Sequence, residues 1–578
     1  MSTGAINKSP LTKTKLWKFH GGVHPPFHKD DSNQTPISFA GIPEQLVLPL
    51  QQHIGIEAEP SVHVGDDVSK GQIIASASHN GLSANIHAPT SGVISAIEER
   101  TLPHISGLSG LCIVIDTDAK DDWKNSKLNT YPDFNNTESK LLLEQIQQAG
   151  IVGLGGATFP TAVKLSSSKA IKTLIINGAE CEPYITCDDR LMRDEATKII
   201  TGIRILQKLL KPETCLIAVE DNKPEAIKAL QLACQDDDGI SDNVKVVAIP
   251  TLYPSGGEKQ LIEILTGQQV PSGELPLDIG LIGLNIGTVY SIYKAIIEGE
   301  PLLSRIITVT GNGINKPQNF EALIGTSFNY LAEQAGGYTK MADHLIMGGP
   351  MMGFALADDQ IPIIKATNCA LISSTTALSE SNSEYADQPT LPCIRCGKCM
   401  DVCPVKLLPQ QMYWHIRAKD FEKAQDHNIN DCIDCGCCSY VCPSHIPLVD
   451  YYRFAKNEIR DQKIAQEKAD LSRERHEFLL FRKERDKRER DEKRAAHKAA
   501  LQKKKAEAGA KGDKGENKKD TSKADAIKAA MARAKAKKDE RDKESSTRKE
   551  SLADKKTSDK DPSKKALEKN TELKKDEI

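Results

Sequence analysis

Nine of the fifteen cysteines lie between residues 393 and 442, and their spacing is the strongest chemical signal in the sequence. Two runs of four each read C-x2-C-x2-C-x3-C-P; the first begins at Cys393 and ends before Pro404, and the second begins at Cys432 and ends before Pro443. Three thiolates at two-residue intervals on a tight loop can hold three irons of one cubane, while the fourth cysteine points away. Cys437 does not fit the spacing and is a spare thiol.

Both runs match the two-cluster pattern of bacterial ferredoxins, in which the fourth cysteine of each run ligates the other cluster. This resemblance implies crossed ligation of two [4Fe–4S] clusters. Cluster 1 would be held by Cys393, Cys396, Cys399 and Cys442, and cluster 2 by Cys432, Cys435, Cys438 and Cys403. Zinc is the alternative, but a tetrahedral zinc site uses two C-x2-C pairs and needs neither a third cysteine nor the Cys-Pro ending. We expect the six dispersed cysteines to be free, partly buried thiols.

Three further blocks combine glycines with acidic, basic or amide side chains. The first is the glycine-rich loop GIVGLGGATFPTAVK over residues 150–164. It allows close backbone approach to an anion or a planar ring, but it is neither a Walker A loop nor a G-x-G-x-x-G fingerprint. The second, NGAECEP at 177–183, follows a buried strand, where ligand sites form in α/β proteins. The third, YPSGGEK at 253–259, again places glycines beside an acid and a base.

These blocks resemble, in the same order, those of the flavin- and NADH-binding subunit of respiratory complex I. The resemblance implies an FMN and NAD(H) site, whose flavin and nucleotide would be lined by Gly153, Gly155, Phe159 and Lys164. The flavin would be held by Asn177 and Glu180. The site would be completed by Tyr253, Gly256 and Glu258, with Asn285 near the flavin phosphate. Glu182 would face the nicotinamide, and Glu182 and Lys164 are the candidate catalytic residues. The family has acids where this chain has Ala179 and Gly257, so two hydrogen-bond acceptors are missing.

The elements that must position these groups differ along the chain. Residues 41–100 alternate short apolar runs with turn signals, which predicts a small all-β unit. This unit resembles the barrel-sandwich fold of biotinyl and lipoyl carrier domains. Its hairpin, SASHNGLSANIHAP at 76–89, contains no lysine, so we expect a structural or docking module without a covalent swinging arm. Residues 138–300 alternate helical and strand-like stretches, which predicts an α/β domain with buried parallel strands.

We therefore expect a multi-domain α/β and β protein. Its parts would be an N-terminal arm (1–40), a barrel-sandwich hybrid-like domain (41–118), an α/β FMN/NADH-binding domain (138–300), a β-grasp (SLBB-like) unit (301–378), a linker (379–390), a helical two-[4Fe–4S] ferredoxin-like module (391–455) and a charged, largely disordered tail (456–578). Within the tail, the stretch 473–505 can form a solvated helix. This order is similar to that of the RnfC family, which belongs to the Rnf/Rsx electron-transport complexes.

Charge is distributed unevenly along the chain. The residues after 460 carry 38 Lys+Arg against 27 Asp+Glu, whereas the first 460 carry 38 against 52. An acidic body with a basic tail is not typical of a nucleic-acid-binding protein. The sequence has no apolar run of about 18 residues, and its first 17 residues lack an apolar core, so we expect neither a transmembrane helix nor a secretion signal.

The family resemblance implies a peripheral subunit on the cytoplasmic face of the bacterial inner membrane. Electrons would pass between NAD(H), FMN and the clusters, because FMN can split the electron pair of a hydride. Membrane subunits and a ferredoxin-like iron–sulfur subunit would be the partners, and ion movement would belong to the membrane subunits. Two alternatives stay open: a soluble diaphorase- or hydrogenase-type flavin oxidoreductase, and a flavin-free iron–sulfur relay serving a redox-sensing regulator. Ala179 and Gly257, which stand where the family has acids, favour the flavin-free relay among these alternatives.

Overall fold

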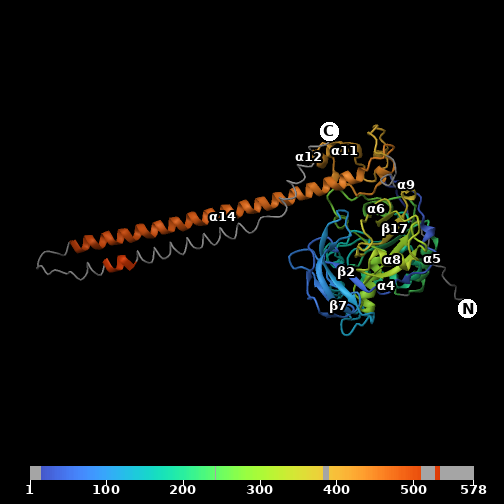
Figure 1. The fold of residues 1–578 in the computed structure, drawn as a ribbon, viewed down its shortest axis with the longest axis horizontal. Coiled ribbons are helices and arrows are strands. Elements are labelled where there is room, and N and C mark those ends of the chain that lie inside the picture. The colour runs from blue at the N-terminus through green and yellow to red at the C-terminus, as the bar shows by residue number, and fades with distance from the viewer. Residues whose placement is uncertain (1–14, 238, 241–242, 382–388, 510–527, 534–578) are drawn as a thin grey trace, which may run out of the picture. The chain divides into compact units, whose positions relative to one another are not determined.

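The protein is described here by a computed structural model that covers residues 15–237, 239–240, 243–381, 389–509 and 528–533. It divides into two units, Met1–Glu467 and Lys468–Ile578. Unit 1 contains all the predicted site residues, and Figure 1 shows its β-rich and helical parts as blue to orange ribbon.

The N-terminal arm leads into a β-sandwich. The arm has little regular structure apart from a 3-10 turn at Lys29–Asp31 and the short strand β1 (Ser38–Phe39). One antiparallel sheet has the order β2-β8-β7-β4, with β2 (Gln45–Pro49), β4 (Asp67–Val68), β7 (Gly92–Thr101) and β8 (Ser109–Thr117). The other contains β3 (Glu59–Pro60), β5 (Ile73–Ser76) and β6 (Ile86–His87). Alternating apolar side chains such as Leu46 and Leu48 turn inward and are fully buried, which is the pattern expected for a sandwich.

A four-stranded parallel sheet carries the predicted flavin site. Its order is β11-β10-β9-β12, with β9 (Thr173–Gly178), β10 (Thr214–Glu220), β11 (Val244–Ile249) and β12 (Leu281–Asn285). The central strands β9 and β10 are nearly continuous apolar runs because both of their faces are covered. Helices pack around this sheet: α1 (Ser139–Gln148), α2 (Thr161–Leu165), α3 (Cys187–Asp194), α4 (Ala196–Leu210), α5 (Pro224–Asp236), α6 (Glu258–Thr266) and α7 (Ile286–Tyr293). The predicted alternation of helices with buried parallel strands is thereby confirmed.

A mixed six-stranded sheet follows. Its order is β1-β14-β13-β17-β15-β16, and its strands are β13 (Ser304–Thr310), β14 (Gln318–Leu323), β15 (His344–Met347), β16 (Phe354–Ala355) and β17 (Cys369–Ser373). Helices α8 (Phe328–Gln334) and α9 (Thr375–Ser381) belong to the same region. Strand β1 of the N-terminal arm pairs in parallel with β14, so the arm closes one edge of a sheet that lies far along the chain.

The cysteine runs lie in a small helical module. It contains α10 (Lys398–Asp401), α11 (Pro409–Arg417), α12 (Phe421–Asp426), α13 (Cys437–Tyr440) and the start of α14 (Leu448–Gly509). The two cysteine runs are 39 residues apart, and the second has the same backbone conformation as the first as well as the same cysteine spacing. Left-handed residues recur at Arg395 and Asp434, and left-handed glycines recur at Gly397 and Gly436, directly before α10 and α13. Each run therefore makes the same tight turn before its short helix.

Helix α14 continues into unit 2 as far as Gly509, with exposed, mostly charged side chains, and it confirms the solvated helix predicted at 473–505. The disorder expected for the rest of the tail falls largely on 510–527 and 534–578, which lie outside the described residues. None of the helices in the described ranges has the length and apolar character that a membrane crossing requires.

Candidate functional site

The glycine-rich loop forms a shallow cradle at the carboxyl edge of the parallel sheet. It is closed by hydrogen bonds from the amide of Gly153 to the carbonyl of Phe159 and from the amide of Thr158 back to Gly153, at 2.9 and 3.0 Å. A Cβ added at Gly155 would lie 3.2 Å from the Cβ of Asn285, and one added at Gly156 would meet nothing within 4 Å. The loop thus packs closely on Asn285 at Gly155 and leaves open space at Gly156, as a planar or anionic ligand requires.

Two asparagines meet at this edge, as the parallel strands require. Asn177, next to the last residue of β9, lies beside Asn285 of β12, and the two are register partners. Asn177 Nδ2 donates to the carbonyl of Gly256 at 2.8 Å. Asn285 Nδ2 donates to Asp188 at 2.6 Å, while its Oδ1 accepts from the amide of Gly287 and caps α7. The predicted site residues Asn177, Gly256 and Asn285 therefore lie together, and Asp188 joins them.

One side of the cleft is closed by an ion pair. Lys164 of α2 lies 2.9 Å from Glu258, the first residue of α6. Both were predicted site residues, and neither is fully buried. Lys164 pairs with Glu258 and Arg190 pairs with Asp194, so neither cation forms an ion pair with Glu180 or Glu182 in the described part of the chain.

The two predicted glutamates lie on residues 179–186, here called the acidic loop. The Glu180 carboxylate accepts from the amides of Asp188 and Asp189, at 2.6 and 3.2 Å. Burial, with the nearby charge of Asp188, raises the pKa of Glu180 to about 8. A group with this pKa can bind or release a proton near neutral pH.

Glu182 turns toward the loop that follows β15. Its Oε1 accepts from the amides of Met351 and Met352, at 2.7 and 2.9 Å. A Cβ at Gly349 would come within 2.2 Å of the Glu182 side chain, so only glycine allows this approach. Burial raises the pKa of Glu182. The structure therefore places Glu182 at a junction with the mixed sheet, which sequence reasoning did not foresee.

Tyr253 connects the cleft with the second cysteine run. It is fully buried, and its hydroxyl donates to the carbonyl of Cys435 at 2.7 Å. Three residues further on, the amide of Gly256 donates to the Cys181 sulfur at 3.3 Å. Tyr253, Cys181, Cys435, Cys437 and Met351 belong to one buried cluster. A short path of packed atoms thus joins the flavin cleft to the cysteine module.

The cysteines of the two runs fall into two groups. A cavity of about 20 Å³ is lined by the sulfur-bearing residues Cys393, Cys396, Cys399 and Cys442, which is the set predicted for cluster 1. Of the other four, Cys403, Cys435 and Cys438 are buried and Cys432 is half-buried. Burial and the charges of Cys435, Cys432 and Cys403 hold the pKa of Cys438 well above its usual range. Eight clustered thiols form the donor set that iron–sulfur clusters need.

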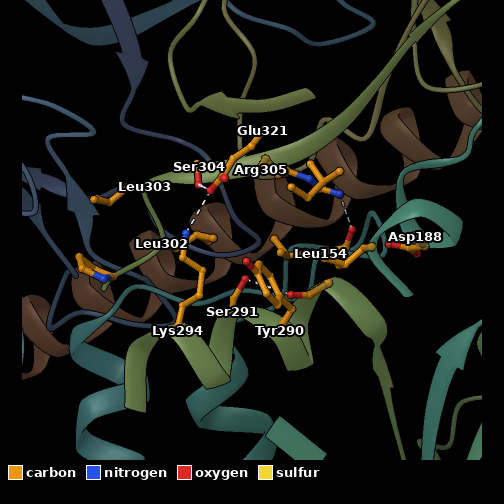
Figure 2. A pocket seen from close by; sticks show the side chains of 14 residues that line it. Leu154, Asp188, Tyr290, Ser291, Lys294, Leu302, Leu303, Ser304, Arg305 and Glu321 are labelled. Carbon is orange, nitrogen blue, oxygen red and sulfur yellow. Dashed lines mark hydrogen bonds and ion pairs between the residues drawn. The ribbon is translucent and has the colours of Figure 1, made fainter. Parts of the chain in front are cut away.

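A second cavity lies behind the glycine-rich loop (Figure 2). Its volume is about 30 Å³, and Leu154, Asp188, Ser291 and Arg305 are among its lining residues. The buried Arg305 donates to the carbonyl of Leu154 at 2.8 Å and so holds the back of the loop. A space of this size suits one or two water molecules and is too small for a flavin.

Sequence reasoning missed three charged residues at the site. Lys29 and Lys223 are almost fully buried against the acidic loop, and Asp188 bonds Asn285. Lys223 could have been suspected, because it follows the end of the buried strand β10 by three residues. Asp188 lies ten residues after β9, in the first turn of α3. Lys29 lies in an irregular polar arm, where no spacing points to it.

Four family models match the chain in order. They are the RnfC barrel sandwich hybrid domain over residues 17–120, the Nuo51 FMN-binding domain over 146–294, an SLBB domain over 306–355 and a 4Fe–4S dicluster domain over 392–446. The predicted kinds of domain are confirmed. The open cradle and the eight clustered thiols fit FMN and two [4Fe–4S] clusters, which are the cofactors of these domains.

Three curated relatives are named as the C component of an ion-translocating oxidoreductase complex, and each is 50% identical to this chain. The match covers 77% of this chain and 62% of the protein from Yersinia pseudotuberculosis, 82% and 60% for Vibrio cholerae, and 77% and 70% for Yersinia pestis. The chain thus spans about three fifths of the length of the first two relatives.

Two solved structures of an NAD+-reducing [NiFe]-hydrogenase are similar to this chain, at 17% and 15% identity and TM-scores of 0.40 and 0.41. The similarity covers 50% and 54% of this chain and 54% and 61% of those chains, and it is too weak to carry an argument. The curated relatives, by contrast, match most of both chains at high identity. This chain belongs to the RnfC family of ion-translocating oxidoreductase complexes.

Proposed function

We propose that the chain passes electrons between NAD(H), FMN and two [4Fe–4S] clusters as a peripheral subunit of an ion-translocating oxidoreductase complex. The observation that carries the proposal is the buried hydrogen bond between Tyr253, beside the flavin cleft, and Cys435 of the second cysteine run. A flavin and a cluster separated by so few packed residues can exchange electrons directly. FMN, when bound, supplies the ability to take electrons in a pair and release them singly.

The flavin would lie over the glycine-rich loop, against Gly153, Gly155 and Phe159. Asn177, Gly256 and Asn285 meet at the strand ends and would hold it. Its phosphate would lie near Asn285, which caps the N-terminus of α7, where backbone amides favour an anion.

The charged residues of the cleft would orient the nucleotide. Lys164, held by Glu258, places a cation at the cleft wall, where it can attract a phosphate group. Glu180 is half-buried beside the strand ends, and Glu182 is fixed by two backbone amides. We assign Glu182 and Lys164 to the nicotinamide nucleotide, and Tyr253 to the wall between the cleft and the clusters.

The two clusters would act in a fixed order. Cluster 2, on Cys432, Cys435, Cys438 and Cys403, is next to the flavin because Tyr253 bonds to Cys435. Cluster 1, on Cys393, Cys396, Cys399 and Cys442, is next to solvent because Cys396 is exposed. Electrons would therefore pass between the flavin and an outside partner through cluster 2 and then cluster 1, in either direction.

The surface around Cys396 suits a small redox partner. Leu391, Ile394 and Met400 are exposed apolar side chains there. Arg395 and Lys398 are exposed bases beside them. Electron-transfer encounters use small interfaces, with apolar contact at the centre and charge complementarity for steering. The partner we propose is an acidic, ferredoxin-like iron–sulfur subunit, with membrane subunits of the complex moving the ion at the cytoplasmic face of the inner membrane.

The experiment that tests the function is made on anaerobically purified full-length chain. Iron and acid-labile sulfide are measured per chain, released flavin is quantified by fluorescence, and absorbance is followed after NADH addition. About eight irons, bound FMN and bleaching by NADH would support the NAD(H)-to-cluster path. Eight irons without bound flavin, and without bleaching by NADH, would indicate that the chain is a flavin-free iron–sulfur relay. Purification with soluble catalytic partners instead of membrane subunits would favour a soluble diaphorase.

A further inference from the structure

We propose that Lys29, which the N-terminal arm carries into the core, is a positioning residue of the flavin site. Its ammonium group turns the backbone of the acidic loop so that the amides of Glu180 and Cys181, and not the loop carbonyls, are available to the flavin. The inference rests on the proposed FMN function and adds to it a residue that no motif contains.

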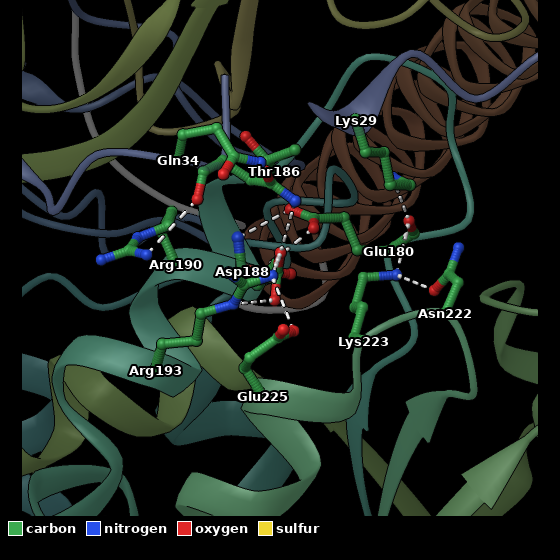
Figure 3. A network of polar contacts seen from close by, with 12 residues as sticks. Lys29, Gln34, Glu180, Thr186, Asp188, Arg190, Arg193, Asn222, Lys223 and Glu225 are labelled. Atoms are coloured by element: carbon green, nitrogen blue, oxygen red, sulfur yellow. Dashed lines mark hydrogen bonds and ion pairs between the residues drawn. The ribbon is translucent and has the colours of Figure 1, made fainter. Parts of the chain in front are cut away.

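The Lys29 ammonium donates all of its hydrogen bonds to carbonyl oxygens of the acidic loop. Its Nζ donates to the carbonyls of Glu180, Glu182 and Ile185, at 2.8, 2.9 and 2.7 Å. Figure 3 shows the bond to Glu180. A lysine ammonium has three N–H donors, and all three are used here. Lys29 is 8% exposed, so water does not replace these bonds at low cost.

A second buried ammonium acts on the start of the same loop. Lys223 Nζ donates to the carbonyl of Ala179 at 2.7 Å and pairs with Glu220 at 2.8 Å. The carbonyls of Ala179 and Glu180 therefore both turn toward lysines. In a planar trans peptide the N–H of the next residue points the opposite way, so the amides of Glu180 and Cys181 point away from the lysines.

The Cys181 amide lies beside the predicted flavin site. A Cβ added at Gly256, a residue of the cleft, would lie 3.7 Å from the amide nitrogen of Cys181. In the described ranges, neither the Glu180 nor the Cys181 amide donates to a protein acceptor. An amide without a protein acceptor can donate to a ligand. The carbonyl edge of a flavin is an acceptor of the required kind.

The loop would not hold this shape by itself. Glu180 and Tyr184 have φ of 51° and 69°, the left-handed region that side chains other than glycine rarely adopt. Such conformations persist only where surrounding contacts enforce them. The three hydrogen bonds from Lys29 run to carbonyls between Glu180 and Ile185, a stretch that contains both strained residues. These bonds hold the loop in its strained conformation.

The arm that carries Lys29 is itself fixed at the cluster side. The amide of Gly22 donates to the carbonyl of Val402 at 3.0 Å, and His20 Nδ1 donates to the carbonyl of Cys403 at 3.0 Å. A Cβ at Gly21 would lie 2.4 Å from the Val402 carbonyl oxygen, so glycine is required for this approach. The arm therefore sets the acidic loop relative to a predicted ligand of cluster 2.

The test compares full-length, cluster-loaded wild type with Lys29→Met, which keeps the length of the side chain and removes its donors. The FMN dissociation constant is measured by fluorescence quenching. Hydrogen exchange of residues 179–186 is measured in flavin-free protein. We expect FMN binding to weaken roughly tenfold or more, with faster exchange in the acidic loop and an unchanged iron content.

Lys365→Met is the matched control. Lys365 is also fully buried and donates only to backbone carbonyls, those of Asn85 and Gly150, at 2.7 and 2.8 Å. The Lys365→Met substitution also removes a buried lysine ammonium, but this ammonium does not contact the acidic loop. Hydrogen exchange of residues 179–186 in this variant should therefore match that of the wild type.

FMN affinity within twofold of wild type and unchanged loop exchange in Lys29→Met would overturn the inference. A wild-type chain that holds its clusters but binds no FMN would instead overturn the proposed function. If Lys29→Met does not fold, Lys29→Ala is prepared with propylammonium, which can occupy the vacated space. FMN affinity that rises with propylammonium, and not with sodium at equal ionic strength, supports the role of the ammonium; an affinity that ignores propylammonium refutes it.

Discussion

Paired cysteine substitutions can establish which thiols share a cluster. If the ligation is crossed, Cys393→Ala/Cys442→Ala removes two ligands of one cluster, and about four of the eight irons remain. Cys393→Ala/Cys403→Ala then removes one ligand from each cluster, and the iron content falls toward zero. If each run instead holds its own cluster, the two results exchange places. The same number of thiols is lost in both variants, so only the connectivity separates them.

The structure favours crossed ligation. Cys442 of the second run lines the same small cavity as Cys393, Cys396 and Cys399 of the first. The 39-residue repeat of the backbone turns gives both runs the same geometry, so the fourth cysteine of each leaves its loop in the same way.

The assay is iron and acid-labile sulfide per chain after anaerobic purification, with electron paramagnetic resonance of the reduced protein. Cys234→Ala is a control outside both runs, and it should keep about eight irons. About four irons in Cys393→Ala/Cys403→Ala, together with almost none in Cys393→Ala/Cys442→Ala, would refute crossed ligation. Equal iron contents in the two variants would also contradict it.

Three further outcomes follow from the buried contacts around the cleft. Tyr253→Phe removes the hydrogen bond to Cys435 and should cost about 1 kcal/mol of stability. It should keep iron and FMN but slow cluster reduction after NADH addition in stopped-flow absorbance; an unchanged rate would count against the proposed path. Glu220→Gln and Lys223→Met each break a buried pair at 2.8 Å and should each cost about 3–5 kcal/mol, whereas the double variant should cost less than their sum. The free energy of unfolding is measured by denaturant unfolding. If the double variant loses as much stability as the two single variants together, Glu220 and Lys223 are not coupled. Glu180 has its folded-state pKa raised from 4.5 to about 8, so the folded state binds the extra proton and stability should decline as pH rises through that window. Glu180→Gln should flatten this decline in thermal unfolding of flavin-free protein, and an unaltered slope would show that Glu180 does not cause it.

Much of the architecture could be predicted from the sequence because it depends on residues that are close together along the chain. The cysteine spacing is set within single turns, and the left-handed Gly397 and Gly436 are where such turns need them. The apolar strands β9 and β10 stand out as continuous runs between helical stretches. The meeting of Asn177 with Asn285 also follows from local information, because parallel strands bring their carboxyl ends to one edge.

The features that sequence reasoning missed depend on contacts between distant segments. Glu182 could be placed in a motif, but its bonds to Met351 and Met352 depend on how the mixed sheet packs against the flavin domain. Lys29 lies more than 150 residues from the carbonyls that it binds, in a segment without periodicity. No pattern within the arm distinguishes this lysine from a solvated one. The roles assigned to the cleft residues remain predictions for the experiments above.

The arm also imposes an order on how the molecule is completed. His20 bonds to Cys403, 383 residues further along the chain. At about 5–20 residues per second, a ribosome needs roughly 20–80 seconds to make the intervening polypeptide. During that time His20 is already synthesised, but Cys403 is not. Lys29 has its acceptors much sooner, because the carbonyls of Glu180 and Ile185 lie only about 150 residues after it. The arm can therefore dock on the flavin domain first, and its contacts with the cysteine module form last.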